Sequence, residues 1–260
     1  MNDVMSVVSS ARKTDRINMK DITSMMIDDF IELHGDRVFK DDPAIIGGIG
    51  KLNGRAVTVI GNQKGTTVEE NVRTNFGSAH PEGYRKSLRL MKQAEKFNRP
   101  VLNFINTSGA YCGVEAEERG QGEAIARNLL EMSDLSVPVL SVIIGEGGSG
   151  GALALALSDE VWMMEFSIYS ILSPEGFASI LWKDAKKASD AAELMKLTSS
   201  DLLKLGIIEK VIPETEKQEA LEKDQIIANM KKEIDEKLFE LVRVSKNELI
   251  RKRYDRFRQY

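Results

Sequence analysis

Between residues 80 and 165 the chain alternates short apolar runs with helical stretches. Runs at residues 101–105 and 138–144 predict buried strands, because they are short and rich in β-branched residues. A helical pattern over residues 82–98 precedes the first run, and another over 115–132, interrupted by Gly120 and Gly122, separates the two. This order predicts an α/β fold with parallel βαβ units, whose loops open at one edge of the sheet.

The flanking segments give further elements. Residues 44–49 and 56–60 predict two strands joined by an Asn53-Gly54 hairpin turn. The apolar spacing over 23–33 predicts a helix that ends at Gly35. Further strands are expected at residues 161–166, 170–172 and 207–212, and short helices at 185–197 and 200–205.

Residues 214–260 differ from the rest, because they are highly charged and carry an apolar stripe. The stripe consists of Leu221, Ile227, Met230, Ile234, Leu238 and Leu241. It predicts a long amphipathic helix, or a pair of helices, lying on another surface of the protein. We therefore expect a helical segment over 1–40, a core over 41–213 and a helical extension over 214–260.

Residues 141–160 contain the most informative pattern. An apolar run leads into five glycines, and an apolar helix is expected over residues 152–157; the glycines are Gly145, Gly147, Gly148, Gly150 and Gly151. A strand that feeds a glycine turn at a helix N-terminus presents unpaired N–H groups. Such groups can hold a phosphate, or an oxyanion that develops during a reaction. A second glycine loop lies at residues 107–113.

Three interpretations compete for this turn. Gly147-Gly-Ser-Gly-Gly151 matches a hydrolase nucleophile elbow, but His34 and His80 both precede Ser149, which excludes that triad order. Ser149 is then a small residue in a crowded turn. Phosphate and dinucleotide loops are disfavoured, because the lysine with Ser/Thr and the well-placed acidic residue are missing.

The oxyanion interpretation needs only two convergent N–H groups. Gly150 and Gly151 would supply one pair, and Gly109 with Ala110 another. The alternative is that the glycines only allow a helix to pack closely on a strand.

Composition narrows the class of protein. The chain has 260 residues, 42% of them hydrophobic, with a net charge of −4 that disfavours nucleic-acid binding. Its one cysteine, Cys112, excludes an intrachain disulfide and a cysteine-rich zinc site. No signal peptide or membrane-spanning run is expected. These features predict a cytoplasmic protein that binds neither membrane nor DNA.

A set of motifs in one order resembles a known family. They are His34-Gly-Asp-Arg37, Asp41-Asp42, Gly47-Gly48, Gln63-Lys64-Gly65, Asn75-Phe-Gly77, His80-Pro-Glu-Gly-Tyr-Arg-Lys86, Ala116-Glu-Glu-Arg-Gly-Gln121, Gly145-Glu-Gly-Gly-Ser-Gly-Gly-Ala-Leu-Ala154 and Ser173-Pro-Glu-Gly176. Over residues 22–213 the chain resembles the α subunit of bacterial acetyl-CoA carboxylase carboxyltransferase. That family has the crotonase (ClpP-like) fold of repeated ββα turns.

The resemblance implies an activity and its partners. The family transfers a carboxyl group from carboxybiotin, held on the biotin carboxyl carrier protein, to acetyl-CoA. The product, malonyl-CoA, begins fatty-acid biosynthesis. The family acts as an α2β2 heterotetramer, so the α chain is active only with its β subunit. Zinc belongs to the zinc-ribbon β subunit, no metal is expected in this chain, and ATP is used by a separate biotin carboxylase.

The resemblance also implies roles for particular residues. The backbone amides of Gly150 and Gly151 would form the oxyanion hole facing biotin, while Gly147 and Gly148 shape the turn. Gly109 and Ala110 belong to the second loop. Candidate biotin or anion contacts are Tyr111, Lys64, Arg85 and Arg37.

The chain departs from the family pattern in the second loop. Asn106, Ser108 and Cys112 stand where the family usually has Asp, Pro and Pro, and Asn62 replaces a common histidine. Two other hypotheses therefore stay open. One is a free-standing crotonase-type acyl-CoA hydratase or decarboxylase, and the other is a degenerate, non-catalytic α-type partner subunit.

Overall fold

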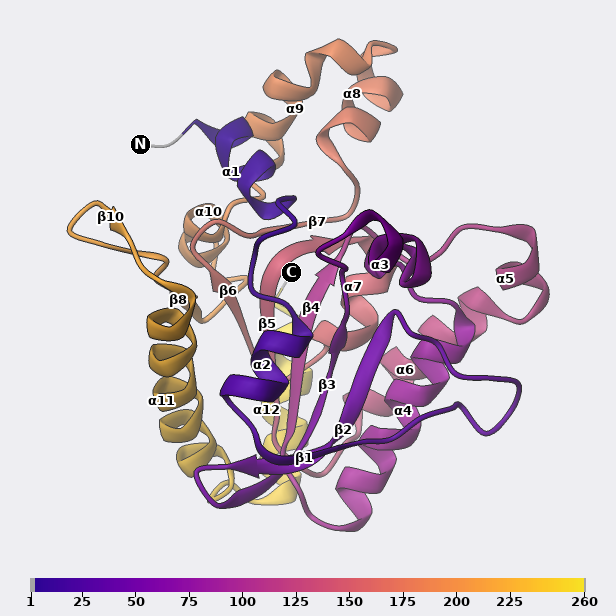
Figure 1. The fold of residues 1–260 in the computed structure, drawn as a ribbon, viewed down its shortest axis with the longest axis vertical. Helices are drawn as coiled ribbons and strands as arrows, with labels where there is room; N and C mark the ends of the chain where they lie inside the picture. Colours follow the sequence, from indigo (N-terminus) through magenta and orange to yellow (C-terminus); the bar gives the residue numbers. More distant parts are fainter. Residues whose placement is uncertain (1–2, 260) are drawn as a thin grey trace.

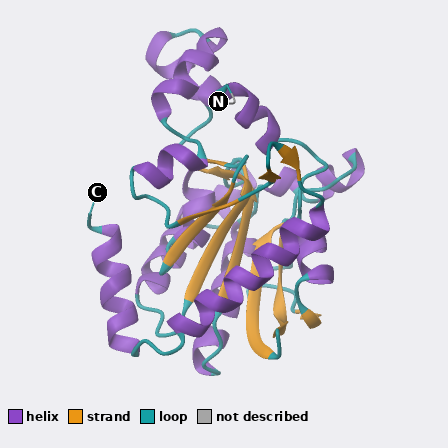
Figure 2. Cartoon of the chain, turned by 90° about the vertical axis from the view of Figure 1, so that its left-hand side faces the viewer, coloured by secondary structure: helices purple, strands orange, loops and turns teal. Residues whose placement is uncertain are grey.

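A mixed sheet runs through the centre of the protein, with helices on both faces (Figures 1 and 2). The computed structural model describes residues 3–259. The strands are β1 (Asp28–Glu32), β2 (Ile45–Leu52), β3 (Arg55–Asn62), β4 (Val101–Thr107), β5 (Val139–Gly148), β6 (Glu160–Met164), β7 (Ile168–Ser170) and β8 (Lys210–Ile212). Their order in the sheet is β1-β2-β3-β4-β5-β6-β8, with β7 pairing beside the end of β5.

Helices occupy most of the remaining chain. They are α1 (Val4–Ala11), α2 (Met19–Met25), α3 (Val68–Arg73), α4 (Pro81–Lys96), α5 (Val114–Glu118), α6 (Gln121–Ser133), α7 (Ser149–Ala156), α8 (Pro174–Trp182), α9 (Ala188–Met195), α10 (Ser199–Lys204), α11 (Lys223–Leu241) and α12 (Lys246–Phe257). Short 3-10 turns lie at Asn75–Gly77 and Ala185–Lys187. A small hairpin, β9 (Thr215–Glu216) with β10 (Glu219–Ala220), precedes α11.

The strand directions confirm the predicted α/β organisation. β2 and β3 form an antiparallel hairpin around Asn53-Gly54, and β3 through β6 then run parallel. Helix α4 connects β3 to β4, while α5 and α6 connect β4 to β5. The carboxyl ends of β4 and β5 therefore lie at the same edge of the sheet, where both glycine loops begin.

Each face of the sheet has its own apolar core. On one face, α4, α6 and α7 bury residues such as Tyr84, Met132 and Leu155. On the other, α2 and α11 cover Phe104 and Trp162. Ile227, Met230, Ile234 and Leu238 of the predicted C-terminal stripe are all buried in this second core. The extension is therefore a pair of helices, α11 and α12, and α11 packs on the sheet.

The helix predicted over residues 23–33 was wrong in its second half. Helix α2 starts at an Asn18 capping box and ends at Met25. Residues 28–32 form the edge strand β1, which pairs antiparallel with β2. Asp29 has a φ of +52°, which a continuing right-handed helix excludes. The apolar residues that matched one helical pattern therefore belong to two elements, helix α2 and strand β1.

Two further elements differ from the prediction. The helix expected over 115–132 breaks into α5 and α6 at Gly120, which has a φ of +83°. Helix α8 was not foreseen, although Ser173 caps it and Pro174 occupies its first turn.

Helices α1, α8 and α9 gather at one end of the molecule (Figure 1). We call this group the end lobe. Val8 and Ala11 of α1 pack against Ala192 of α9, Leu197 and Ile168 of β7 in a separate apolar cluster. The end lobe is thus attached to the sheet through β7, which runs beside the glycine-rich end of β5.

No helix within residues 3–259 combines the length and apolar character needed to cross a membrane.

Candidate functional site

The glycine turn is sharper than the sequence predicts. Strand β5 continues through Gly145, Gly147 and Gly148, and α7 begins immediately at Ser149 rather than at residue 152. Ser149 makes the reversal with a φ of +56°, in the left-handed region. Gly150 and Gly151 therefore lie in the first turn of α7, where N–H groups have no acceptor within the helix.

The two glycine loops touch each other. A Cβ atom on Gly148 would collide with the carbonyl oxygen of Ser108, and one on Gly151 with the backbone nitrogen of Ala110. Glycine is required at both positions because backbone approaches backbone. The crowding falls on these two glycines and not on Ser149, whose side chain is exposed. The prediction that both loops open at the same edge is confirmed.

The two predicted donors of the second loop are not equivalent. The Gly109 N–H donates to Thr107 Oγ1 at 3.1 Å, so it is engaged within its own loop. The Ala110 nitrogen lies against Gly151. This leaves Ala110 as the donor of this loop that can join Gly150 and Gly151.

Tyr84 lies directly beneath the touching loops, and sequence reasoning missed it. Its hydroxyl is buried without a hydrogen-bond partner, 2.8 Å from where a Cβ of Gly151 would be. Burial raises the pKa of Tyr84 well above its ordinary value, so the hydroxyl keeps its proton. The group that lies beneath Gly151 is therefore an uncharged hydroxyl.

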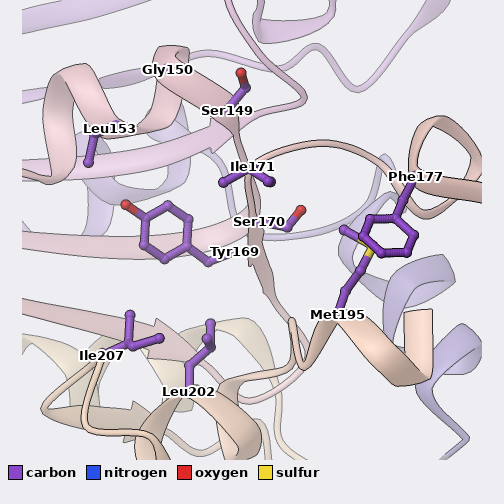
Figure 3. A pocket seen from close by; sticks show the side chains of 10 residues that line it. All are labelled: Ser149, Gly150, Leu153, Tyr169, Ser170, Ile171, Phe177, Met195, Leu202 and Ile207. Carbon is purple, nitrogen blue, oxygen red and sulfur yellow. The ribbon is translucent and has the colours of Figure 1, made fainter. Parts of the chain in front are cut away.

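An apolar cavity of about 580 Å³ opens beside the turn (Figure 3). Ser149, Gly150 and Leu153 line it from α7. Its other walls come from β7, the end lobe and the segment around α10; they include Tyr169, Ile171, Phe177, Met195, Leu202 and Ile207. Desolvation raises the pKa of Tyr169 to about 12. An amide donor at an apolar cavity acts more strongly on developing charge than it would in water.

A second hollow, of about 610 Å³, lies at the 107–113 loop. Gly109, Ala110, Tyr111 and Cys112 line it together with Phe76. The Tyr111 ring lies against the His80 ring, with centroids 4.2 Å apart. A hydrogen bond with Glu115 raises the pKa of Tyr111. Among the predicted contact residues, Tyr111 is the one at the site.

The three predicted cationic contacts lie elsewhere. Lys64 Nζ is 2.5 Å from Glu146 Oε2, and Arg85 pairs with Asp36 at 2.8 Å. Arg37 is exposed, and its Nη1 donates to the backbone carbonyl of His34 in the same loop at 2.8 Å. None of the three lines either hollow.

The departures from the family pattern have distinct surroundings. Asn106 Oδ1 accepts a hydrogen bond from the Glu146 N–H at 3.1 Å, so it joins the ends of β4 and β5. Asn62 donates to the Gly77 carbonyl at 3.2 Å. Cys112 is exposed at the second hollow. Asn106 therefore maintains a link between the two loops.

Sequence reasoning also missed a set of ion pairs next to the turn. Arg12 contacts both Glu146, on β5, and Glu175, on α8. These partners are 134 and 163 residues away along the chain. No local pattern could have indicated them, because only the folded topology brings them together.

Within residues 3–259, no three His, Cys, Asp or Glu side chains form a group that could hold a metal ion.

Solved structures share this fold. Transcarboxylase 12S matches with a TM-score of 0.71 and 17% identity, over 92% of this chain and 44% of that one. The β subunit of Pseudomonas aeruginosa geranyl-CoA carboxylase matches with a TM-score of 0.67 and 15% identity, over 94% of this chain and 46% of that one. These matches show that the chain has the crotonase fold.

Sequence comparisons define the family more narrowly. The model for acetyl co-enzyme A carboxylase carboxyltransferase-like proteins matches residues 3–260. The acetyl-coenzyme A carboxylase carboxyl transferase subunit alpha of Streptococcus thermophilus is 61% identical over 260 residues, which is the full length of both chains. Its counterpart in Streptococcus pneumoniae is 58% identical over 99% of this chain and 100% of its own length. The chain belongs to the acetyl-CoA carboxylase carboxyltransferase alpha family.

Proposed function

We propose that this chain supplies the biotin-facing half of a carboxyltransferase site, which moves a carboxyl group from carboxybiotin to acetyl-CoA and yields malonyl-CoA. One observation carries the proposal. In the first turn of α7, Gly150 lines the apolar cavity and the adjacent Gly151 packs against the backbone of Ala110 in the second glycine loop. Full-length relatives named acetyl-coenzyme A carboxylase carboxyl transferase subunit alpha support the proposal.

These residues would stabilise charge rather than attack the substrate. Gly150 and Gly151 would donate hydrogen bonds to the ureido oxygen of biotin, which gains negative charge as the carboxyl group leaves. A preorganised donor of this kind is worth about 3–4 kcal/mol. The positive end of α7 would add to the effect. Ala110 would contribute a third amide, and Tyr111 would contact biotin from the side of the second hollow.

The remaining components belong to other chains in this proposal. A zinc-ribbon β subunit would bind acetyl-CoA in an α2β2 assembly, and a biotin carboxyl carrier protein would deliver the carboxyl group. ATP would be used by a separate biotin carboxylase, and the assembly would work in the cytoplasm. Residues 41–213 would carry the site, with 1–40 and 214–260 supporting it. Lys64, Arg85 and Arg37 have no ligand contact in this proposal, because Lys64 and Arg85 are paired with carboxylates and Arg37 donates to a carbonyl of its own loop.

A free-standing crotonase would need an acid–base carboxylate beside the turn. Glu146 is next to the turn in sequence, but Lys64 and Arg12 both hold it. Arg12 Nε contacts one carboxylate oxygen and Lys64 Nζ the other, so neither oxygen is left free to contact a substrate. No observation favours the degenerate-partner hypothesis over the active one.

The test is the reverse reaction, biotin-dependent decarboxylation of malonyl-CoA, by this chain mixed with a zinc-ribbon β subunit. A Cβ on Gly150 would make only an ordinary 3.7 Å contact with Ile125, so the backbone there leaves room for the first atom of a side chain. Gly150→Val would crowd the donors, and we expect a loss of about 10²–10³ in kcat.

Gly122→Ala is the matched control, because nothing lies within 4 Å of the added Cβ. Its kcat should equal that of the unchanged complex. If Gly150→Val turned over at the same rate as Gly122→Ala, the proposed role of the turn would be wrong.

A further inference from the structure

We propose that Arg12 is a positioning residue, which holds the α8 wall of the apolar cavity at a fixed place relative to the glycine turn. The inference rests on the proposed function and adds that biotin extends from the Gly150 amide into this cavity. Arg12 touches neither hollow itself. It acts through the two carboxylates that it joins.

Arg12 follows α1 directly and contacts two separate elements. Its Nη1 and Nη2 lie 2.8 and 3.1 Å from the two carboxylate oxygens of Glu175, which is a bidentate pair. Its Nε lies 3.0 Å from Glu146 Oε1. A planar guanidinium held at three donors fixes the direction of both partners as well as their distance.

The Glu146 end of this bridge is rigid. Glu146 is only 7% exposed and lies two residues before Gly148. Its second carboxylate oxygen contacts Lys64 Nζ at 2.5 Å, and its N–H donates to Asn106 at 3.1 Å. Arg12 is therefore anchored to the strand that delivers the turn.

The Glu175 end reaches the cavity wall. Glu175 lies in the first turn of α8, two residues before Phe177, which lines the cavity. Met195 of α9 lines it as well. Figure 1 places α8 and α9 beside α1 in the end lobe, away from the helices that cover the sheet. Apolar contacts join α1 to α9, while the Arg12–Glu175 pair is a polar link from α1 to α8.

The exposure of Glu175 allows an effect on the position of α8 to be distinguished from an effect on stability. The Glu175 side chain is 42% exposed, and ion pairs at such sites contribute little to folding free energy. The pair can hold α8 in place even if it contributes little to the folding free energy. Loss of the pair should therefore move the cavity wall without unfolding the protein.

The experiment compares Arg12→Gln, Glu175→Gln and the double variant, each assembled with the zinc-ribbon β subunit. We expect each single variant to raise the KM for free biotin in malonyl-CoA decarboxylation by about three- to tenfold. The KM for malonyl-CoA should stay unchanged. The double variant should be no worse than the poorer single variant, because both changes break one link.

Lys13→Gln is the matched control, since it removes an exposed positive charge at the next residue. It should leave the KM for biotin unchanged. An unaltered KM for biotin in Glu175→Gln, or a parallel change in kcat, both KM values and Tm, would overturn the inference.

Hydrogen exchange separates this inference from the proposed function. Arg12→Gln should speed amide exchange in α8 and leave α6 unchanged, whether or not the complex turns over. If the complex without any substitution were inactive, that result would reject the proposed function but not the role of Arg12. Unchanged exchange in α8 would reject the role of Arg12.

Discussion

Five glycines in seven residues suggest one shared purpose, but at the residue scale they differ. Gly148 and Gly151 are glycines because the neighbouring loop leaves no room for a Cβ, whereas Gly150 has room for one. Gly145 and Gly147 lie within β5, against Asn106 and Tyr169 respectively. Only Gly148 and Gly151 must therefore be glycine because backbone atoms of the other loop lie against them.

Gly151→Ala should force the two loops apart, because the added methyl group meets the backbone nitrogen of Ala110 and not a flexible side chain. We expect a loss of about 1–3 kcal/mol in the free energy of unfolding. Urea denaturation measures it. Gly122→Ala, in helix α6, should instead gain up to about 1 kcal/mol. Equal stabilities for the two variants would contradict the described contact.

The Arg12–Glu175 pair gives stability a small dependence on acid, small because the Glu175 side chain is 42% exposed. The hydrogen bond from Arg12 lowers the pKa of Glu175 from 4.5 to about 2 in the folded protein. Since the folded state favours the ionised form, the stabilisation is present above pH 4.5 and is lost as the pH falls toward 2. Denaturation across this window should show a smaller decline for Glu175→Gln than for the unchanged chain. A decline of the same size would exclude this pair as a contributor.

At the scale of elements, helix α12 is fixed by one buried cation. The Arg253 guanidinium contacts Asp159 and donates to the carbonyls of Met132, Leu135 and Val137. Desolvation raises the pKa of Asp159, against the effect of Arg253. Asp159 also accepts from the Val139 N–H, at the start of β5. The C-terminal helix is thus connected to the strand that carries the glycine turn.

Arg253→Ala would leave Asp159 buried without its cation. We expect a loss of about 3–5 kcal/mol in the free energy of unfolding, read from urea denaturation. Arg251→Ala, an exposed position on the same helix, should change it by less than about 0.5 kcal/mol. A small effect at Arg253 would show that α12 is held by its other contacts, such as the Arg256–Glu209 pair.

The sequence predicted the elements whose signals were local. Period and turn residues identified β2, β3, β4 and α4, because Asn53-Gly54 and Pro100 mark their ends. Strand β1 was missed because its residues matched a helical spacing while their pairing with β2 depended on the sheet. Helix α8 could have been found from Ser173 and Pro174.

At the scale of the whole molecule, the site is assembled from distant segments. The glycine turn could be predicted, since a strand, glycines and a helix are contiguous there. The walls could not, because α1, α8, α9 and β7 meet only through the folded topology. For the same reason the sequence could not show that Lys64 and Arg85 are each paired with a carboxylate.

The most direct test of the account is malonyl-CoA formation from acetyl-CoA and carboxylated carrier protein by this chain, by a zinc-ribbon β subunit and by their mixture. We predict product from the mixture alone. A well-formed complex that makes no malonyl-CoA would identify the chain as a non-catalytic partner. Turnover of an acyl-CoA by this chain alone, without biotin, would contradict the account and establish an independent crotonase.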